Sequence, residues 1–166
     1  MKAKDLMTAK PKTCSLDTNL AAAAELMLAG DCGLLPVLEE SKLVGVVTDR
    51  DLYIALATRD RQASDVRIGE VAQSPVYTCS PDDDLEAVLA TMKQHRVRRV
   101  PVAGFGGTVL GVISLDDMAL AAGPARAVAA SAVLDTMQAL RSHHHAAPQI
   151  AVACWGWRDA RKGPYR

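Results

Sequence analysis

The sequence predicts a mixed fold of the α/β (α+β) class, in which two β-α-β-β-α repeats pack as a pseudo-twofold pair and a C-terminal helix and tail follow. Three observations support this prediction. A seven-residue motif occurs at residues 45–51 and again at 111–117. The residues around it recur in the same order over ~55 residues per copy. Within each copy, segments typical of strands alternate with segments that have helical apolar spacing.

The repeated motif marks the passage from a strand to a helix. Its two copies read GVVTDRD at residues 45–51 and GVISLDD at 111–117. A β-branched pair favours a strand, and the Thr or Ser that follows it is a good helix N-cap. After the first motif, Leu52, Ala55 and Leu56 continue with helical spacing. Each motif therefore predicts a strand that runs directly into a helix.

The chain divides around these two copies. A shift of 65 positions places Cys14 on Cys79, and one extra residue near the glycine-rich turn 104–107 makes the later shift 66. Neither copy has enough apolar helix surface to close a core alone, so we expect the two to pack sheet against sheet with a cleft between them. The predicted units are a first repeat at 1–62, a second at 63–123, and a helix and tail outside the repeats at 124–166.

Helix and strand patterns follow the same order in both copies, with Asn19 and Asp84 as predicted N-caps. In the first copy we expect a helical turn at 5–7, an extended segment at 12–15, a helix at 20–29, strands at 34–38 and 43–48, and a helix at 49–57. In the second copy we expect a helix at 85–94, strands at 100–103 and 109–114, and a helix at 116–122. The polar residues 58–68 are predicted to link the copies.

The region beyond the repeats predicts one further helix, at 125–141, with apolar residues on one side. Such a stripe requires a partner, either the repeats themselves or a second copy of the chain. The remaining tail contains the run His143 to His145, which we interpret as part of a frayed terminus rather than as metal ligands. Trp155 and Trp157 are candidate anchors for this tail.

Charge and composition exclude several classes of protein. The chain has 19 basic and 19 acidic residues, which does not suggest binding to nucleic acid. No apolar run approaches the ~20 residues that span a bilayer, and the N-terminus lacks a signal-peptide pattern, so we expect a cytoplasmic protein that does not bind membranes. No C-x-x-C pair is present, and we expect buried free thiols at Cys14, Cys32, Cys79 and Cys154.

The motif residues can bind a nucleotide or only cap a helix. A helix N-terminus offers unpaired N–H groups that suit a phosphate, and Thr48 and Ser114 add a hydroxyl donor there. One turn further on, Asp51 and Asp117 offer carboxylates that can accept hydrogen bonds from ribose hydroxyls. The same [S/T]-x-x-[D/E] pattern is also a capping box, in which these side chains satisfy backbone N–H groups. Two copies in register favour the ligand-binding interpretation.

Several segments together resemble a tandem pair of CBS domains, the module named after cystathionine β-synthase, over about residues 1 to 123. They are DLMT at 5–8, GLLPV at 33–37, RRVPV at 98–102, and the two motifs of the form Gly-h-h-[Thr/Ser]-x-x-Asp. The chain also looks like the small stand-alone CBS-pair proteins of bacteria, including those of the hypoxic-response type.

The resemblance implies an adenine-nucleotide site in each cleft between the repeats, for AMP, ADP, ATP, S-adenosylmethionine or NAD. In that family the motif hydroxyl contacts phosphate and the motif aspartate contacts ribose. This assigns Thr48 and Asp51 to one site, and Ser114 and Asp117 to the other. Adenine usually lies along the first extended segment of a repeat, and the residues at that place here are Thr13, Cys14, Val76, Tyr77 and Thr78.

A basic segment at 95–102 resembles the part of the AMP-activated kinase γ subunit whose basic pair meets phosphate. This implies that Arg98 and Arg99 bind phosphate, the alternative being that they are solvated surface arginines. The equivalent residues of the first copy, Gly33 and Leu34, are uncharged. We therefore expect two sites of unequal phosphate affinity, while the sequence leaves open which cleft the arginines face.

Together these observations predict a non-enzymatic regulatory module in which the adenine nucleotide is a regulatory ligand and not a cofactor. Its conformational change would be sensed by the second subunit of a homodimer, or by a protein partner that the sequence does not identify. Catalysis is disfavoured because the sequence has no nucleophile–base pair, no P-loop and no metal-ligand spacing. Two alternatives stay open: a redox- or metal-responsive protein that uses the cysteines or the histidine run, and a ligand-free dimerisation or interaction module whose motifs only cap helices.

Overall fold

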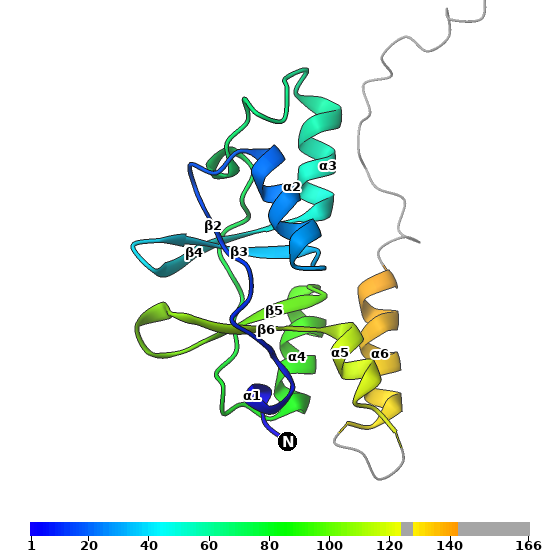
Figure 1. The fold of residues 1–166 in the computed structure, drawn as a ribbon. Helices are drawn as coiled ribbons and strands as arrows, with labels where there is room; N and C mark the ends of the chain where they lie inside the picture. Colours follow the sequence, from blue (N-terminus) through cyan, green and yellow to red (C-terminus); the bar gives the residue numbers. More distant parts are fainter. Residues whose placement is uncertain (124–127, 143–166) are drawn as a thin grey trace, which may run out of the picture.

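The structure, a computed structural model, describes residues 1–123 and 128–142, and its elements follow the predicted order (Figure 1). The first half of the repeat region contains α1 (Ala3–Leu6), β1 (Thr8–Ala9), β2 (Cys14–Ser15), α2 (Leu20–Ala29), β3 (Leu34–Glu39), β4 (Lys42–Thr48) and α3 (Asp49–Thr58). The second half contains the 3-10 turn η1 (Ile68–Glu70), α4 (Leu85–His95), β5 (Arg99–Ala103), the 3-10 turn η2 (Phe105–Gly107), β6 (Val109–Ser114) and α5 (Leu115–Leu120). The last described element is α6 (Ala130–Arg141).

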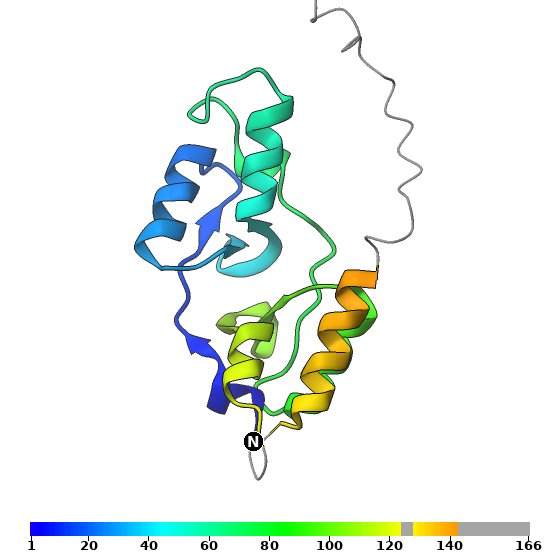
Figure 2. The same ribbon diagram turned by 90° about the vertical axis from the view of Figure 1, so that its right-hand side faces the viewer.

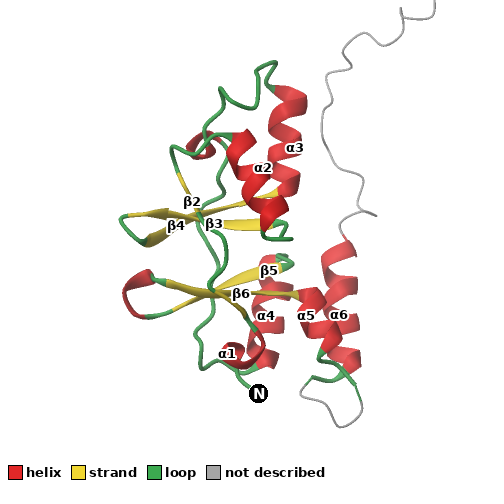
Figure 3. Ribbon diagram, viewed as in Figure 1, coloured by secondary structure: helices red, strands yellow, loops and turns green. Residues whose placement is uncertain are grey.

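Two small sheets lie at the centre of the molecule. One has the strand order β2-β3-β4 and the other the order β1-β6-β5. Their hairpins have equivalent registers, since Val37 lies opposite Gly45 and Val102 lies opposite Gly111. Figure 3 shows the sheets facing each other, with the helices of each repeat on the outer side of its own sheet. This is the pseudo-twofold arrangement that the sequence predicts.

The start of each repeat crosses to the sheet of the other repeat. β1 pairs with β6, where Thr8 lies opposite Val112. At the equivalent place Gln73 bridges Val46 of β4, and the two residues exchange backbone hydrogen bonds of 3.1 and 2.8 Å. Main-chain hydrogen bonds therefore join the repeats in both directions.

These crossings explain the glycine that opens each motif. A Cβ on Gly111 would lie 2.5 Å from Sδ and 2.9 Å from Cβ of Met7, which immediately precedes β1. A Cβ on Gly45 would lie 3.3 Å from Cβ of Ala72, next to Gln73. The motif glycine thus provides space for the crossing segment, and a side chain would clash more severely at Gly111 than at Gly45.

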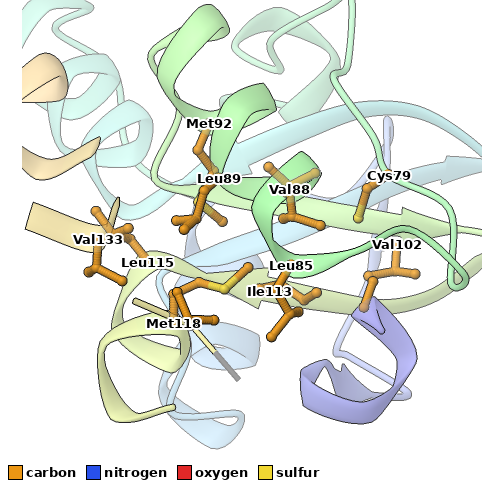
Figure 4. Close-up of a cluster of buried hydrophobic side chains, with 13 residues drawn as sticks. Cys79, Leu85, Val88, Leu89, Met92, Val102, Ile113, Leu115, Met118 and Val133 are labelled. Carbon is orange, nitrogen blue, oxygen red and sulfur yellow. The ribbon is translucent and has the colours of Figure 1, made fainter. Parts of the chain in front are cut away.

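Each repeat has its own apolar core. The core of the second repeat combines side chains of α4, β5, β6 and α5 (Figure 4) with Ala3 from α1. The core of the first repeat in turn contains Val66 and Ile68, which follow α3 and are fully buried. The predicted linker at 58–68 is therefore wrong for its last residues, because these two apolar side chains complete a core instead of spanning solvent.

α6 covers the second repeat, where it lies along α4 and α5 (Figure 2). Val133 is buried and Met137 and Leu140 are partly buried against the same core, so the repeat itself is the partner of the apolar stripe. The helix was predicted to begin at residue 125, but its first described residue is Ala130. Residues 125–127, like the tail from 143 to 166 with its histidines and tryptophans, lie outside the described residues.

The predicted N-caps differ in chemistry. Asn19 Oδ1 accepts a hydrogen bond from the backbone N–H of Ala22 at 2.8 Å. Asp84 holds the N-cap position of α4, but its side chain makes no capping bond and pairs instead with Lys2 Nζ at 3.0 Å. The reason is that α1 lies beside it and offers a cation. Among the described residues, no helix has the length and apolar character needed to cross a membrane.

Candidate functional site

Both motif pairs form a capping box at the start of a helix. At α3, Thr48 Oγ1 donates to Asp51 Oδ2 at 2.6 Å and accepts from the backbone N–H of Asp51 at 3.3 Å, while the backbone N–H of Thr48 donates to the same Oδ2 at 2.8 Å. At α5 the corresponding distances between Ser114 and Asp117 are 2.7, 3.1 and 2.8 Å. The capping geometry that the sequence allows is thus present in both copies, and all four side chains are half-buried.

Asp51 has a third partner that the sequence analysis missed. Gln73 Nε2 donates to Asp51 Oδ1 at 2.6 Å. Because Gln73 belongs to the crossing segment, this bond ties the first motif to the start of the second repeat. Thr8 occupies the equivalent position in the other crossing segment. The 65-residue repeat alone does not indicate that Gln73 hydrogen-bonds to a motif aspartate.

A cavity of about 540 Å³ opens beside Thr48, between the repeats, and we call it the Thr48 cleft. Its polar lining comes from the start of α3, from Gln73 and from residues 96–99, which follow α4. Its apolar lining consists of Leu34, Val46, Ile54 and Val97. The cleft therefore brings the first motif together with both predicted phosphate arginines, Arg98 and Arg99.

A second cavity, of about 330 Å³, opens beside Ser114, and we call it the Ser114 cleft. It is lined by Ser114 and Asp117 of the second motif and by residues 30–34, which follow α2 in the first repeat. Lys10 and Lys12 also line it. The sequence alone does not indicate these two lysines as site residues, because they lie between β1 and β2, far from either motif in sequence.

The two clefts are related by the pseudo-twofold axis. In each, the motif of one repeat faces the segment of the other repeat that joins its first helix to its next strand. This segment turns sharply because Asp31 (φ 44°) and Arg96 (φ 56°) adopt the left-handed conformation just beyond α2 and α4. A ligand in either cleft would therefore contact both repeats.

The clefts differ in the charge of their lining. The Thr48 cleft is lined by four arginines and two aspartates, whereas the Ser114 cleft is lined by three basic residues and three aspartates. Arg98 lines the Thr48 cleft, and Arg99 lines both. Of the two clefts, Arg98 therefore borders only the Thr48 cleft, and Arg99 borders both. The first motif has the greater excess of positive charge beside it.

Arg99 reaches both clefts because it crosses the backbone of Gly33. A Cβ at position 33 would lie 2.9 Å from Nη2 of Arg99 and 2.7 Å from Oδ2 of Asp49. The guanidinium therefore lies over a bare backbone between the clefts. Gly33 was predicted only as an uncharged position, but the absence of a side chain there is what makes room for Arg99.

Four of the five residues predicted to contact adenine lie on or near the surface, and none of the five lines either cleft in the described part of the chain. Thr13 and Val76 are half-buried, and Thr78 is exposed. The ring of Tyr77 stacks on that of His95, with centroids 3.7 Å apart. Contact between these residues and adenine stays a prediction.

The fifth of these residues, Cys14, is buried in the first core, with Sγ 4.0 Å from the carbonyl oxygen of Pro36. Its repeat equivalent Cys79 has the same environment, 3.9 Å from the carbonyl oxygen of Pro101. Burial raises the pKa of each thiol to about 11, so both remain protonated at neutral pH. Cys32 is different, since it is half-buried and lines the Ser114 cleft.

Two crossed repeats, each with a capped motif at the mouth of a cleft shared with the other, define a tandem-repeat module with two clefts between its repeats. The chain belongs to the CBS domain family, whose model matches residues 3–58 and 68–123. The two matches begin at Ala3 and Ile68, which are equivalent under the 65-residue shift. The resemblance inferred from the motifs is therefore confirmed, and α6 lies outside the matched residues.

Known relatives share the repeats. The chain is 32% identical over 117 residues to CBS domain-containing protein YhcV of Bacillus subtilis, a match that covers 70% of this chain and 82% of that protein. It is 30% identical over 118 residues to Hypoxic response protein 1 of Mycobacterium tuberculosis, again covering 70% of this chain and 82% of the relative.

Two solved structures have the same fold. The crystal structure of Hypoxic Response Protein I with two coordinated zinc ions has a TM-score of 0.65 at 30% identity, covering 72% of this chain and 98% of that one. The CBS domain pair of protein MJ0100, in complex with 5′-methylthioadenosine and S-adenosyl-L-methionine, has a TM-score of 0.67 at 26% identity, covering 72% and 94%.

Proposed function

We propose that this chain is a non-enzymatic regulatory module that binds an adenine nucleotide in the clefts between its CBS repeats and signals by a change in their arrangement. The observation that carries the proposal is that both clefts are built from both repeats. A ligand that contacts the two repeats at once stabilises one relative placement over others, and such a difference in affinity is what a conformational signal requires.

The chemistry of the Thr48 cleft suits a nucleotide. The start of α3 offers backbone N–H groups to a phosphate, and the arginines add charge-assisted donors. Leu34, Val46 and Val97 provide apolar surface for a base. A carboxylate accepts about four hydrogen bonds, and Asp51 has three donors from Thr48 and Gln73, so a place remains for a ribose hydroxyl. The adenosyl ligands of the MJ0100 structure support this class of ligand.

A homodimer is the proposed form in which the signal is transmitted. Large apolar side chains are exposed on α2 and α3, among them Leu28 and Tyr53, which are 84% and 72% exposed. Such exposure on adjacent helices is typical of an interaction surface. Light scattering with and without nucleotide measures the assembly, and a monomer under both conditions would remove this part of the proposal.

The experiment that tests nucleotide binding is calorimetric titration of the nucleotide-stripped chain with AMP, ADP, ATP, S-adenosylmethionine and NAD, with and without Mg²⁺. We expect micromolar affinity for at least one of them, and loss of that affinity when Asp51→Asn and Asp117→Asn are combined. Asn19→Ala is the matched control, because it removes a helix cap that lines neither cleft and costs about 1 kcal/mol of stability. If no nucleotide binds, the two motifs act only as helix caps.

A metal-responsive function is the second candidate, since the Hypoxic Response Protein I structure contains two coordinated zinc ions. Within residues 1–123 and 128–142, no group of three or more His, Cys, Asp or Glu side chains is placed to hold a metal ion. Cys14 and Cys79 are buried and protonated, which makes them poor zinc ligands. Metal analysis of untagged protein tests this candidate: stoichiometric zinc that is lost in Cys32→Ser would favour it over nucleotide binding.

A further inference from the structure

Four arginines line a pocket beside the Thr48 cleft, which we call the arginine pocket. They are Arg50 of α3, Arg96 and Arg98 after α4, and Arg141 in the last turn of α6. The pocket has a volume of about 380 Å³, and its other lining residues are apolar: Leu115, Met137 and Leu140. No carboxylate is among the described residues that line it.

The arginine pocket adjoins the Thr48 cleft, because Arg50, Arg96 and Arg98 line both. Arg141 is the basic residue that the arginine pocket adds, and it comes from outside the CBS repeats matched by the family model. Its place is set by the packing of α6, whose residues Met137 and Leu140 lie against the second core.

The chemistry of this pocket suits a polyanion. A guanidinium does not lose its proton in proteins, so four arginines that line one pocket concentrate positive charge there. Guanidinium forks match the oxygen atoms of phosphate groups and bind them with paired hydrogen bonds. The Ser114 cleft, in contrast, has basic and acidic lining residues in equal number.

We propose that the arginine pocket binds the distal phosphates of a nucleoside polyphosphate whose nucleoside occupies the Thr48 cleft, and that α6 senses this ligand through Arg141. The inference rests on the proposed function, because it needs a nucleotide in that cleft. A monophosphate meets only the start of α3 and the cleft arginines. A di- or triphosphate extends into the arginine pocket and adds Arg141, so the appended helix distinguishes ATP and ADP from AMP.

The test is calorimetric titration of the full, nucleotide-stripped chain with AMP, ADP, ATP and inorganic tripolyphosphate, in the wild type and in Arg141→Gln. We expect ATP to bind about tenfold more tightly than AMP, and Arg141→Gln to weaken ATP about tenfold while changing AMP less than about twofold. Arg141→Lys keeps the positive charge but loses the guanidinium fork, so we expect its affinity for ATP to lie between those of the wild type and Arg141→Gln. Tripolyphosphate binds more weakly than ATP, with the same dependence on Arg141.

Lys93→Gln is the matched control, since Lys93 is an exposed cation on α4 that borders α6 but lines a separate hollow. It leaves both affinities unchanged, and thermal melting verifies that each variant is folded. If ATP and AMP bind alike, or Arg141→Gln weakens them equally, the inference is wrong and Arg141 only complements the carbonyl end of α6. If no nucleotide binds, the proposed function fails, and binding of tripolyphosphate alone would show an adventitious polyanion site.

Discussion

Gln73 Nε2 lies 2.6 Å from Asp51 Oδ1, so a residue at the start of the second repeat hydrogen-bonds to the carboxylate proposed to receive a ribose in the first. The other oxygen of Asp51 accepts two hydrogen bonds from Thr48. A ribose diol that binds through both its hydroxyls must therefore share or displace the bond from Gln73. Gln73, in the crossing segment, therefore competes with such a ligand for Asp51 in the Thr48 cleft.

Replacing Gln73 by Thr, the residue found at the equivalent position 8, removes this competitor. We predict about fivefold tighter nucleotide binding at the Thr48 cleft. In the wild type the ligand must displace the hydrogen bond between the Gln73 amide and the Asp51 carboxylate, which costs about 1 kcal/mol, and in Gln73→Thr it does not. Calorimetry measures the change, with Gln62→Thr as a control in the exposed stretch after α3. Weaker binding in Gln73→Thr would mean instead that the amide orients Asp51 for the ligand.

Alanine at the two motif glycines should have unequal effects. In Gly111→Ala the new methyl group lies within 2.9 Å of the backbone-proximal Cβ of Met7, which cannot move without displacing β1. We predict a loss of about 2 kcal/mol in the free energy of unfolding, against less than about 1 kcal/mol for Gly45→Ala, where the nearest atom is 3.3 Å away. Chemical denaturation measures both, and equal losses would contradict the steric explanation.

The cysteines provide a measure of occupancy at the Ser114 cleft. In a Cys154→Ser background at pH 8, iodoacetamide should alkylate Cys32 first, because Cys14 and Cys79 are buried and have a pKa of about 11. Nucleotide at about ten times its Kd should slow the reaction of Cys32 about tenfold. Asp117→Asn should abolish this protection, and mass spectrometry follows each site. Protection that persists in Asp117→Asn would place the ligand elsewhere.

Acidification should loosen the segments that cross between the repeats. A hydrogen bond from the backbone N–H of Arg67, together with the Arg61 guanidinium, holds the pKa of Glu70 in η1 below its ordinary value of 4.5. The Lys4 ammonium likewise holds the pKa of Asp82 below its ordinary value of 3.8. Because both folded pKa values are lowered, the stabilisation is complete above the ordinary values and is lost as the pH falls through the lowered ones.

Carbon-detected NMR titration of the carboxyl groups measures these midpoints. In Arg61→Gln we expect the midpoint of Glu70 to rise toward 4.5 while that of Asp82 stays in place, since the pKa of Asp82 is lowered by Lys4 and not by Arg61. A midpoint of Glu70 that does not move would assign the lowering of its pKa to the backbone N–H of Arg67 and to Arg59 instead of Arg61.

The repeat architecture could be predicted because local rules agree in both copies. Asn19 caps α2 and Thr48 caps α3 as their residue types predict, and the matched hairpins follow from β-branched runs. The crossings could not be predicted in this way. β1 has two residues and Gln73 forms a single bridge, so neither gives a periodic pattern, and the partners are chosen by tertiary packing.

The candidate site, like the fold, could be predicted from the sequence only in part. Thr48, Asp51 and Arg98 could be identified because each belongs to a repeated motif or to a basic run, and the structure brings all three to one cleft. Gln73 and Arg141 were missed, because each reaches the site from an element that is distant in sequence. Asp84 shows the converse case: its N-cap position was predicted correctly, but its side chain pairs with Lys2, the residue before α1.

The crossed edges also determine when the chain can fold during its synthesis. Thr8 leaves the ribosome before most of both repeats, yet its partner Val112 emerges only after almost all of both repeats has been made. At about 5–20 residues per second, the N-terminal arm waits for several seconds without its sheet. The first repeat can close earlier, as soon as Gln73 reaches Val46. The nascent repeats thus mature in two stages, and β1, which is made before both sheets are complete, is among the last segments to dock.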